Sequence, residues 1–403
     1  MNALRVLEVL RASETCSRAD LVRQLGLSAP TITSVVRDLL DADLVEPLGE
    51  GVSKGGRPPD MIRFKAERGS LAAVQLTATE LRLLLTDLNG REIAATTMAL
   101  RRRASTPEIV CGMVRDGVRA MLDEAGLHKG SLLAVVVGVP AITDVANGVV
   151  MSVSTLQQWR SVPLRAMLRR LLRCAVVIEN DTNLAAMGEH FCGAAQLCRS
   201  VTLVSIGANV GAGILLNGRL HHGAQWSAGE VGYLRLPQTS RKAPTIDAFG
   251  ELETMVTISG LLREWERGAG AAGGTAAARR TTPAEQAIRV LDLAAAGQGR
   301  ARAVVRTRAQ MVADLVVNLS FTLNPELLVL SGVVGGHPAL LAAVQAELAG
   351  ISFGVPPIVA GELGEEATLW GAVAVALEAL PGLLLPEFKA DADLNGAGMR
   401  RQV

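Results

Sequence analysis

The chain has 403 residues, of which 49% are hydrophobic and 20% are charged, and its formal net charge is +1. This length predicts two or three domains with sizeable cores, and the near-zero net charge neither favours nor excludes a nucleic-acid partner. The five cysteines are scattered, odd in number and without a C-x-x-C pair, which argues against a disulfide framework and against a cysteine-based zinc site.

No contact with a membrane is predicted either. No stretch approaches the roughly 18–20 apolar residues that span a bilayer. The first ten residues form an amphipathic run that contains a glutamate, which is not typical of a signal peptide. Reduced cysteines, together with the lack of a signal peptide, predict a cytoplasmic protein.

Residues 1–66 are predicted to form three short helices and a hairpin. The first helix buries leucines and valines at three- and four-residue spacing. These are Leu4, Val6, Leu7, Val9 and Leu10. Ser17 is expected to cap the second helix, with Asp20 at its third position, and the helix is expected to end at Gly26. Ser28 is expected to cap the third helix.

The third helix has two different faces. Its inner face is apolar and consists of Ile32, Val35, Val36, Leu39 and Leu40. Its outward positions carry short polar side chains and one cation, namely Thr31, Thr33, Ser34 and Arg37. Such side chains suit a helix lying in the major groove of DNA, where they meet base edges and phosphates.

A glycine-rich loop at residues 49–59 follows the third helix. Three helices and then a glycine-rich hairpin form the layout of a winged helix-turn-helix. Lys54 and Arg57 in this wing are placed to reach an adjacent minor groove. Residues 1–66 carry nine basic and nine acidic side chains, whereas residues 51–65 carry a net charge of +3, so the basic character is local to the wing. A helical protein-interaction domain is the alternative.

From about residue 70 the pattern becomes that of an α/β protein with two similar halves. Three strands, a helix, a strand and a helix follow one another twice, and Asn-Gly pairs at 89–90 and 217–218 mark tight turns. The predicted strands are 71–75, 81–86, 92–98, 132–139, 175–179, 201–206, 213–216, 231–236 and 327–330. The predicted helices are 107–125, 163–172, 252–266, 284–297, 300–322, 337–348 and 367–379. This order predicts two related lobes with a cleft between them.

Three segments are predicted to lie outside the folded units. Residues 64–69 are expected to act as a linker between the N-terminal domain and the rest of the chain. An Ala/Gly/Thr-rich stretch at 268–282 is predicted to be a flexible insertion. A polar, glycine-containing tail at 387–403 is predicted to be disordered.

A set of short motifs runs through nearly the whole chain. They are Gly56-Arg57-Pro58, Asp87-Leu88-Asn89-Gly90, Gly138-Val139-Pro140, Glu179-Asn180-Asp181-Thr182-Asn183, Gly211-Ala212-Gly213, Gly229-Glu230-Val231-Gly232, Asn324-Pro325-Glu326, Ser331-Gly332 and Gly371-Ala372. In their order and spacing they resemble the ROK family of repressors, open reading frames of unknown function and sugar kinases. The resemblance is strongest to its regulator branch, which includes repressors responding to xylose and N-acetylglucosamine.

This resemblance implies a winged helix-turn-helix over residues 1–66 and, behind it, a two-lobed actin-like, hexokinase-like (RNase H-like) ROK domain. Lobe 1 is expected to comprise residues 70–182, completed by a C-terminal helix at 367–380. Lobe 2 is expected to comprise residues 183–366. The family's oligomers imply a homodimer or a homotetramer.

The resemblance also implies sugar contacts. The matching positions are Thr155, Asn180, Asp181, Glu230, Tyr233 and Glu253. Asp181 matches the catalytic base of the family's kinases, and its alternative role is to cap the helix that follows it. Thr155 stands where the family usually has Asn, and Tyr233 replaces a His. A changed ligand is one interpretation, and a decayed pocket with merely solvated carboxylates is the other.

The phosphate-holding turns of the kinases are altered in this sequence. Gln75–Thr79 replaces Asp-x-Gly-Gly-Thr, so that Gln75 stands for the Asp that organises magnesium and both glycines carry side chains. The second turn, Gly-Thr-Gly-x-Gly-x-Gly in active kinases, is Gly-Ala-Asn-Val-Gly-Ala-Gly at 207–213. The loss of half of each cradle predicts no useful kinase activity and no ATP cofactor. The family's zinc is also expected to be absent, because Tyr233 replaces its His and residues 239–253 contain no Cys or His.

Together these features predict a repressor of carbohydrate-metabolism genes. Its partners would be operator DNA and a sugar or sugar derivative, which closes the lobes and changes the angle between paired winged helices. Two alternatives are a sugar kinase with an added DNA-binding module and a DNA-binding or scaffold protein without a ligand. The sequence specifies neither the sugar nor the operator.

Overall fold

A computed structural model describes residues 2–51, 58–101, 105–152, 156, 158–240, 249–267 and 281–385. Several predicted features lie outside the described residues. These are Lys54, Arg57, Thr155, most of the insertion at 268–282 and the tail at 387–403.

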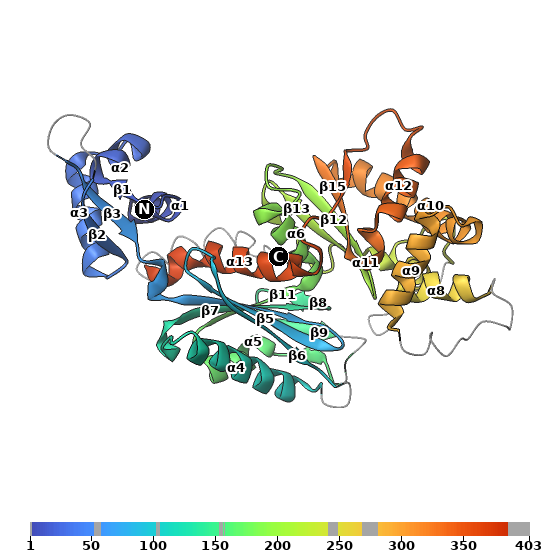
Figure 1. Ribbon diagram of the computed structural model, residues 1–403, viewed down its shortest axis with the longest axis horizontal. Helices are drawn as coiled ribbons and strands as arrows, with labels where there is room; N and C mark the ends of the chain where they lie inside the picture. The colour runs from blue at the N-terminus through green and yellow to red at the C-terminus, as the bar shows by residue number, and fades with distance from the viewer. Residues whose placement is uncertain are drawn as a thin grey trace, which may run out of the picture.

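The N-terminal domain consists of three helices and a small sheet, at one end of the molecule (Figure 1). Its elements are α1 (Asn2–Ala12), β1 (Cys16–Ser17), α2 (Arg18–Leu25), α3 (Ala29–Asp41), β2 (Val45–Glu50) and β3 (Asp60–Phe64), and the strand order is β1-β3-β2. The expected caps are confirmed. The Ser17 side chain accepts from the Asp20 N–H while Asp20 accepts from the Ser17 N–H, Gly26 takes a left-handed φ of 65°, and Ser28 accepts from the Thr31 N–H.

The segment between this domain and the first lobe is packed, contrary to the predicted linker. Ala66–Arg68 form a 3-10 helix, and Phe64 and Ala66 are buried. Leu88 N donates a hydrogen bond to Ala66 O, which ties the segment to the first lobe. The predicted linker was wrong because apolar side chains at alternate positions place this segment inside a core shared by both domains.

Lobe 1 is built on a five-stranded sheet with the order β11-β7-β4-β5-β6. The strands are β4 (Ser70–Leu76), β5 (Glu80–Asp87), β6 (Glu92–Ala99), β7 (Leu132–Val139) and β11 (Ala175–Asn180). Helices α4 (Pro107–Glu124) and α5 (Leu164–Leu172) cover one face, and α13 (Ala367–Leu384) lies on the other (Figure 1). A short sheet of β8 (Ile142–Asp144), β9 (Val149–Ser152) and β10 (Arg160–Val162) follows β7 and was not predicted.

Lobe 2 repeats the same strand topology, with the order β14-β13-β12-β15-β16. The strands are β12 (Val201–Ile206), β13 (Val210–Leu216), β14 (Arg219–Leu220), β15 (Leu327–Ser331) and β16 (Ile358–Ala360). The prediction of a strand at 231–236 was wrong, because Val231–Tyr233 form a 3-10 helix. The third strand of this lobe along the chain is instead β14, which pairs with β13 at the edge of the sheet.

Helices cover both faces of the second sheet. Helix α6 (Asp181–Cys192) lies on one face. The other face packs against α7 (Glu251–Val256), α8 (Ile258–Arg267), α9 (Pro283–Ala295), α10 (Gly299–Leu323) and α12 (Pro338–Leu348), while the short α11 (Gly332–Gly335) follows β15. The helix predicted at 252–266 is interrupted at Thr257, so it forms two helices.

Helices α6 and α13 cross between the two lobes at a pair of glycines. A side chain at Gly371 would collide with Leu184 O, and one at Gly188 would collide with Ala367 O. The close approach of the two backbones therefore requires glycine at both positions.

The helix Gly364–Leu384, which includes α13, is long and apolar enough by length and composition to cross a membrane, contrary to the sequence prediction. More than half of its apolar window is buried inside the fold, as in the core helix of a soluble protein.

Candidate functional site

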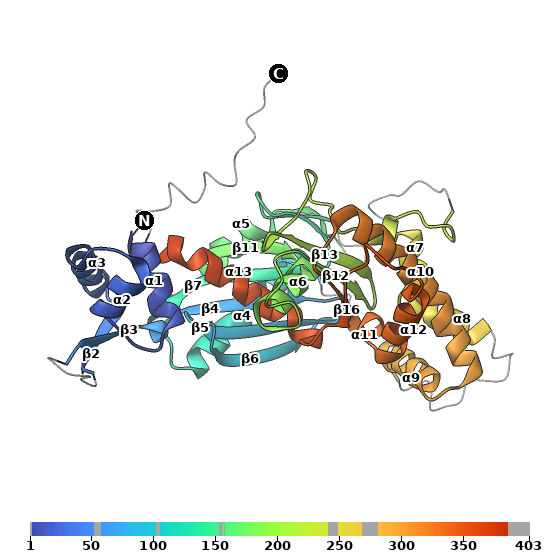
Figure 2. The ribbon, with the colours of Figure 1, turned by 90° about the horizontal axis from the view of Figure 1, so that it is seen from above.

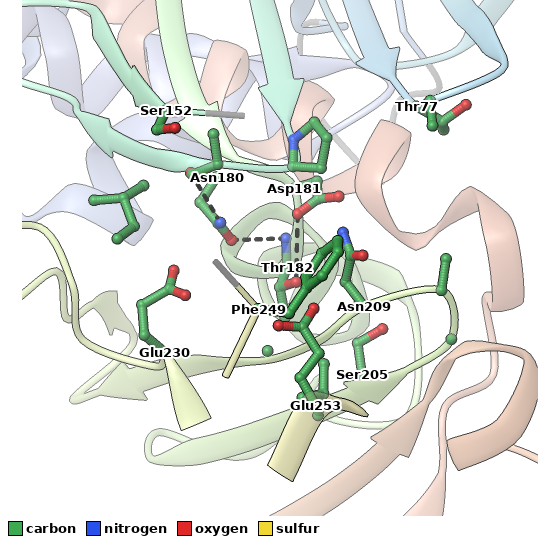
Figure 3. A pocket seen from close by; sticks show the side chains of 18 of the residues that line it. Thr77, Ser152, Asn180, Asp181, Thr182, Ser205, Asn209, Glu230, Phe249 and Glu253 are labelled. Atoms are coloured by element: carbon green, nitrogen blue, oxygen red, sulfur yellow. Dashed lines mark hydrogen bonds between the residues drawn. The ribbon is translucent and has the colours of Figure 1, made fainter. Parts of the chain in front are cut away.

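A cavity of about 270 Å³ lies between the two lobes (Figure 3). Lobe 1 contributes the turn after β4, residues 140–142, and the segment where β11 ends and α6 begins. Lobe 2 contributes the β12–β13 turn, Glu230, Tyr233, Phe249 and Glu253. Its volume is near the lower end of small-molecule pockets, which suits a ligand of monosaccharide size. Of the sugar positions expected from the sequence, the cavity brings together Asn180, Asp181, Glu230, Tyr233 and Glu253.

Asn180, rather than Asp181, caps helix α6. Its Oδ1 accepts hydrogen bonds from Thr182 N at 2.9 Å and Asn183 N at 3.0 Å, and its Nδ2 donates to Ala141 O at 3.1 Å. The amide of Asn180 thus shapes the site by holding the N-terminus of α6, in addition to lining the cavity. The capping role considered for Asp181 is wrong, because Asn180 already satisfies those N–H groups.

Asp181 is consequently available to a ligand. It occupies the first position of α6, and its carboxyl group accepts a 3.4 Å hydrogen bond from the Thr182 hydroxyl. Burial raises the pKa of Asp181 to about 6, because desolvation disfavours the charged form.

Two glutamates of lobe 2 face this carboxyl group across the cavity (Figure 3). Burial, and then the charges of Glu253 and Asp181, raise the pKa of Glu230 to about 7. Burial also raises the pKa of Glu253, which is 9% exposed. No described residue that lines the cavity is Lys, Arg or His. The site therefore concentrates carboxyl groups, which can accept hydrogen bonds.

The opposite end of the cavity contains the two altered turns. In the first turn, the Thr77 hydroxyl accepts hydrogen bonds from Thr79 N at 3.3 Å and Glu80 N at 3.1 Å. These backbone donors are therefore already satisfied by the chain itself. In the second turn, Ala208 and Asn209 line the cavity with side chains. Binding of phosphate at a turn needs free N–H groups, and those of Thr79 and Glu80 in the first turn are not free.

The described residues include no candidate zinc site. Tyr233 lines the cavity at the position of the expected His. Across the described ranges, no group of three or more His, Cys, Asp or Glu side chains is arranged to hold a metal ion. All five cysteines are unpaired.

The outward face of α3 is the candidate DNA-contacting surface. Thr33, Ser34 and Arg37 are exposed, and the Arg37 side chain is 70% exposed. Thr31 is partly buried, and its hydroxyl is 2.7 Å from the Ser28 hydroxyl beside the cap. The Thr33 hydroxyl donates to Ala29 O, which leaves its oxygen as an acceptor. These four residues lie on the helix as the sequence predicted.

Several cavity residues were missed in the sequence. Ile142 and Ser152 belong to the small sheet after β7, whose strands are too short to show a periodic pattern. Phe249 precedes α7, and its position beside the cavity depends on the fold of lobe 2. Ser205 could have been found from the sequence, because it is a polar residue near the end of a buried strand, two positions before the second turn begins.

Comparison with known families supports both parts of this description. The ROK family matches residues 71–379, and the MarR family matches residues 1–54. A xylose repressor of Caldicellulosiruptor bescii is 27% identical over 233 residues, which is 58% of this chain and 58% of that protein. The DNA-binding transcriptional repressor Mlc of Escherichia coli is 26% identical over 266 residues, or 65% of this chain and 64% of Mlc.

A kinase is also among the relatives. A glucokinase of Halalkalibacterium halodurans is 28% identical over 227 residues, covering 54% of this chain and 67% of the kinase. For the xylose repressor and Mlc, the matched part is less than two thirds of the length of each repressor.

Two solved structures share the fold. One is a ROK family transcriptional regulator homologous to E. coli Mlc, with a TM-score of 0.78, 22% identity, and coverage of 96% of this chain and 98% of that chain. The other is a ROK family glucokinase from Streptomyces griseus in complex with glucose and AMPPNP, with a TM-score of 0.62, 22% identity, and coverage of 76% and 99%. The predicted fold class, a winged helix before a two-lobed ROK domain, is confirmed, and the chain belongs to the ROK family.

Proposed function

We propose that this protein is an operator-binding transcriptional regulator, most simply a repressor of carbohydrate genes, whose cavity binds a sugar effector. Two observations carry the proposal: an interlobe cavity lined by three carboxyl groups, with donors of its first turn occupied by Thr77, and a hydrophobic core that joins lobe 1 and α13 to the winged helix. Relatives named xylose repressor and Mlc support the same function. The protein acts in the cytoplasm as a homo-oligomer that reads a palindromic operator, and it is not an enzyme.

The effector is a sugar without a phosphate group. Asp181, Glu230 and Glu253 converge on a cavity that no described Lys, Arg or His lines, so no described cation there would pair with a phosphate group. Sugar hydroxyls, in contrast, donate hydrogen bonds to carboxylates, and such charge-assisted bonds are stronger than neutral ones.

Helix α13 provides the connection between the cavity and the winged helix. At its first turn, the Thr368 hydroxyl donates to Asp181 O at 3.2 Å. Nearer its other end, Leu377 O accepts a hydrogen bond from Arg11 of α1 at 3.5 Å, and this end of α13 lies next to α1 (Figure 2). Closure of the lobes on a sugar would move α6 against α13 at their glycine crossing and thereby tilt α1.

The proposal is tested by measuring operator affinity with and without sugars. D-xylose, D-glucose and N-acetyl-D-glucosamine are compared with glucose 6-phosphate and N-acetylglucosamine 6-phosphate. We expect one unphosphorylated sugar to weaken operator binding by about 5- to 150-fold, the usual range of allosteric coupling, and its phosphate to act at least about tenfold more weakly. Operator affinity that no sugar changes, at any salt concentration, would contradict effector control.

A variant separates the two halves of this proposal. Arg37→Ala on the exposed face of α3 should weaken operator binding and leave sugar binding unchanged, as measured by calorimetry. Arg115→Ala, on α4 of lobe 1, is the matched control and should change neither. Equal operator affinity for the Arg37 variant and the wild type would remove α3 from the DNA interface.

A further inference from the structure

A buried hydrogen bond joins the two lobes behind the cavity. Glu179 lies at the end of β11 in lobe 1, and His222 lies in the segment after β14 in lobe 2. Glu179 Oε2 is 2.7 Å from His222 Nε2. The Glu179 side chain is 4% exposed and that of His222 is 24% exposed, so water competes little for this contact.

The carboxylate of Glu179 is held in place from its other side. Its Oε1 accepts hydrogen bonds from Asn180 N at 2.8 Å and from Asn183 Nδ2 at 3.0 Å. Asn180 and Asn183 flank Asp181 in the chain. Glu179 is therefore fixed to the same turn that presents the Asp181 carboxyl group to the cavity.

On lobe 2, His222 is connected to the cavity residue Glu230, as Glu179 on lobe 1 is connected to Asp181. It begins the loop 222–229, which leads directly to Glu230, and Ala228 N donates to His222 O at 3.1 Å. The imidazole packs edge-on against Trp226, with 5.4 Å between the ring centroids. Trp226 has a φ of 63°, which is unusual for a residue with a side chain. A backbone held in this region indicates a loop whose conformation is imposed by its surroundings.

The loop is anchored to both lobes. Within lobe 2, Ala212 N donates to Gly229 O at 2.8 Å, and a side chain at Gly229 would collide with Ala212 O. Across the cleft, the contact of His222 with Glu179 ties the loop to lobe 1. The first anchor fixes Glu230 on its own lobe, and the second sets its distance from Asp181.

We propose that His222 and Glu179 are positioning residues for sugar binding, which hold Glu230 opposite Asp181 through their hydrogen bond across the lobes. This inference rests on the proposed sugar-binding function. Neither residue lines the cavity, so both act through the carboxylates that do. The role is one of geometry, because a sugar hydroxyl bonded by two opposed carboxylates needs both at a fixed separation.

The test uses the full-length protein and three variants. His222→Ala removes the contact, and His222→Gln restores a donor near the position of Nε2. His221→Ala alters the exposed neighbouring histidine and is the matched control. Calorimetry with D-xylose, D-glucose and N-acetyl-D-glucosamine gives sugar affinity, operator affinity without sugar reports on folding and assembly, and amide hydrogen exchange reports on residues 222–230.

We expect His222→Ala to lower sugar affinity by about tenfold, the effect of one lost hydrogen bond to a charged group, and to speed exchange in residues 222–230. His222→Gln should recover most of the affinity, and His221→Ala should match the wild type in every measurement. Wild-type affinity and exchange in His222→Ala, or a loss that His222→Gln does not recover, would overturn the inference. If no sugar binds the wild type, the proposed function fails, and exchange in the same variants still decides whether the contact holds the loop.

Discussion

The two ends of the interlobe cavity differ in chemistry. At one end, Asp181, Glu230 and Glu253 keep a set of acceptors that suits sugar hydroxyls. At the other end, Thr77 occupies backbone donors of its own turn, and Ala208 and Asn209 add side chains to the second turn. Under the proposed function, binding a sugar and transferring phosphate to it depend on separate parts of this fold.

The largest expected effect is the absence of phosphoryl transfer. Each lost set of preorganised donors costs about 10²–10³ in rate, so two altered turns predict turnover at least ~10⁴-fold below that of an ordinary kinase. An ATP-coupled assay with D-glucose, D-xylose and N-acetyl-D-glucosamine in the presence of Mg²⁺ measures this rate. Turnover in the ordinary range of about 1–100 s⁻¹ would contradict the prediction that the altered turns no longer support phosphoryl transfer.

A smaller effect should separate the two ends directly by substitution. Glu230→Ala removes a charged acceptor and should weaken sugar binding by about 10- to 100-fold, with operator binding in the absence of sugar unchanged. Thr77→Ala at the other end should change sugar affinity by less than about threefold. Calorimetry on both variants provides the measurement, and comparable losses at the two ends would show that the cavity acts as one unit.

The smallest effect concerns pH. The pKa of Glu230 rises from 4.5 to about 7 on folding, so its contribution to stability is full below about pH 4.5 and is lost as the pH rises through about 7. Glu230→Gln lacks this titration. Between pH 5 and pH 8, the wild type should therefore lose on the order of 1–3 kcal/mol of unfolding free energy relative to the variant, after allowance for partial solvation.

Urea unfolding of both proteins at the two pH values measures this difference. The sugar-free protein is required, because a bound sugar would itself shift the titration. If the unfolding free energies of wild type and variant differ by the same amount at both pH values, folding does not raise the pKa of Glu230.

Much of this fold could be predicted because its signals are local. The caps at Ser17 and Ser28, the end of α2 at Gly26 and the long buried strand β7 depend on residues close together in the sequence. Lobe 1 was predicted more accurately than lobe 2 for the same reason. Its strands are long and apolar, whereas residues 231–236 have strand-like composition but their first part, Val231–Tyr233, forms a 3-10 helix that contacts α7.

The site was predictable only in part. Its acidic residues could be found from motifs, but their separation across the cleft depends on the packing of two lobes that are far apart in sequence. Only Asp181 was considered as a cap of α6, whereas Asn180 forms the cap, because either side chain can accept hydrogen bonds from the N–H groups at the start of a helix. The contact of Glu179 with His222 joins residues 43 positions apart and has no sequence signal of its own.

The packed junction at residues 64–69 has a practical consequence for building chimeras. A hybrid that grafts the first 66 residues of this protein onto another ligand domain would carry α1 away from Leu377 and the neighbouring part of α13. The transplantable module is therefore discontinuous and consists of the N-terminal domain plus the C-terminal half of α13. Swapping both pieces together preserves the shared core. It thereby also preserves the proposed coupling between a new ligand domain and the DNA-binding domain.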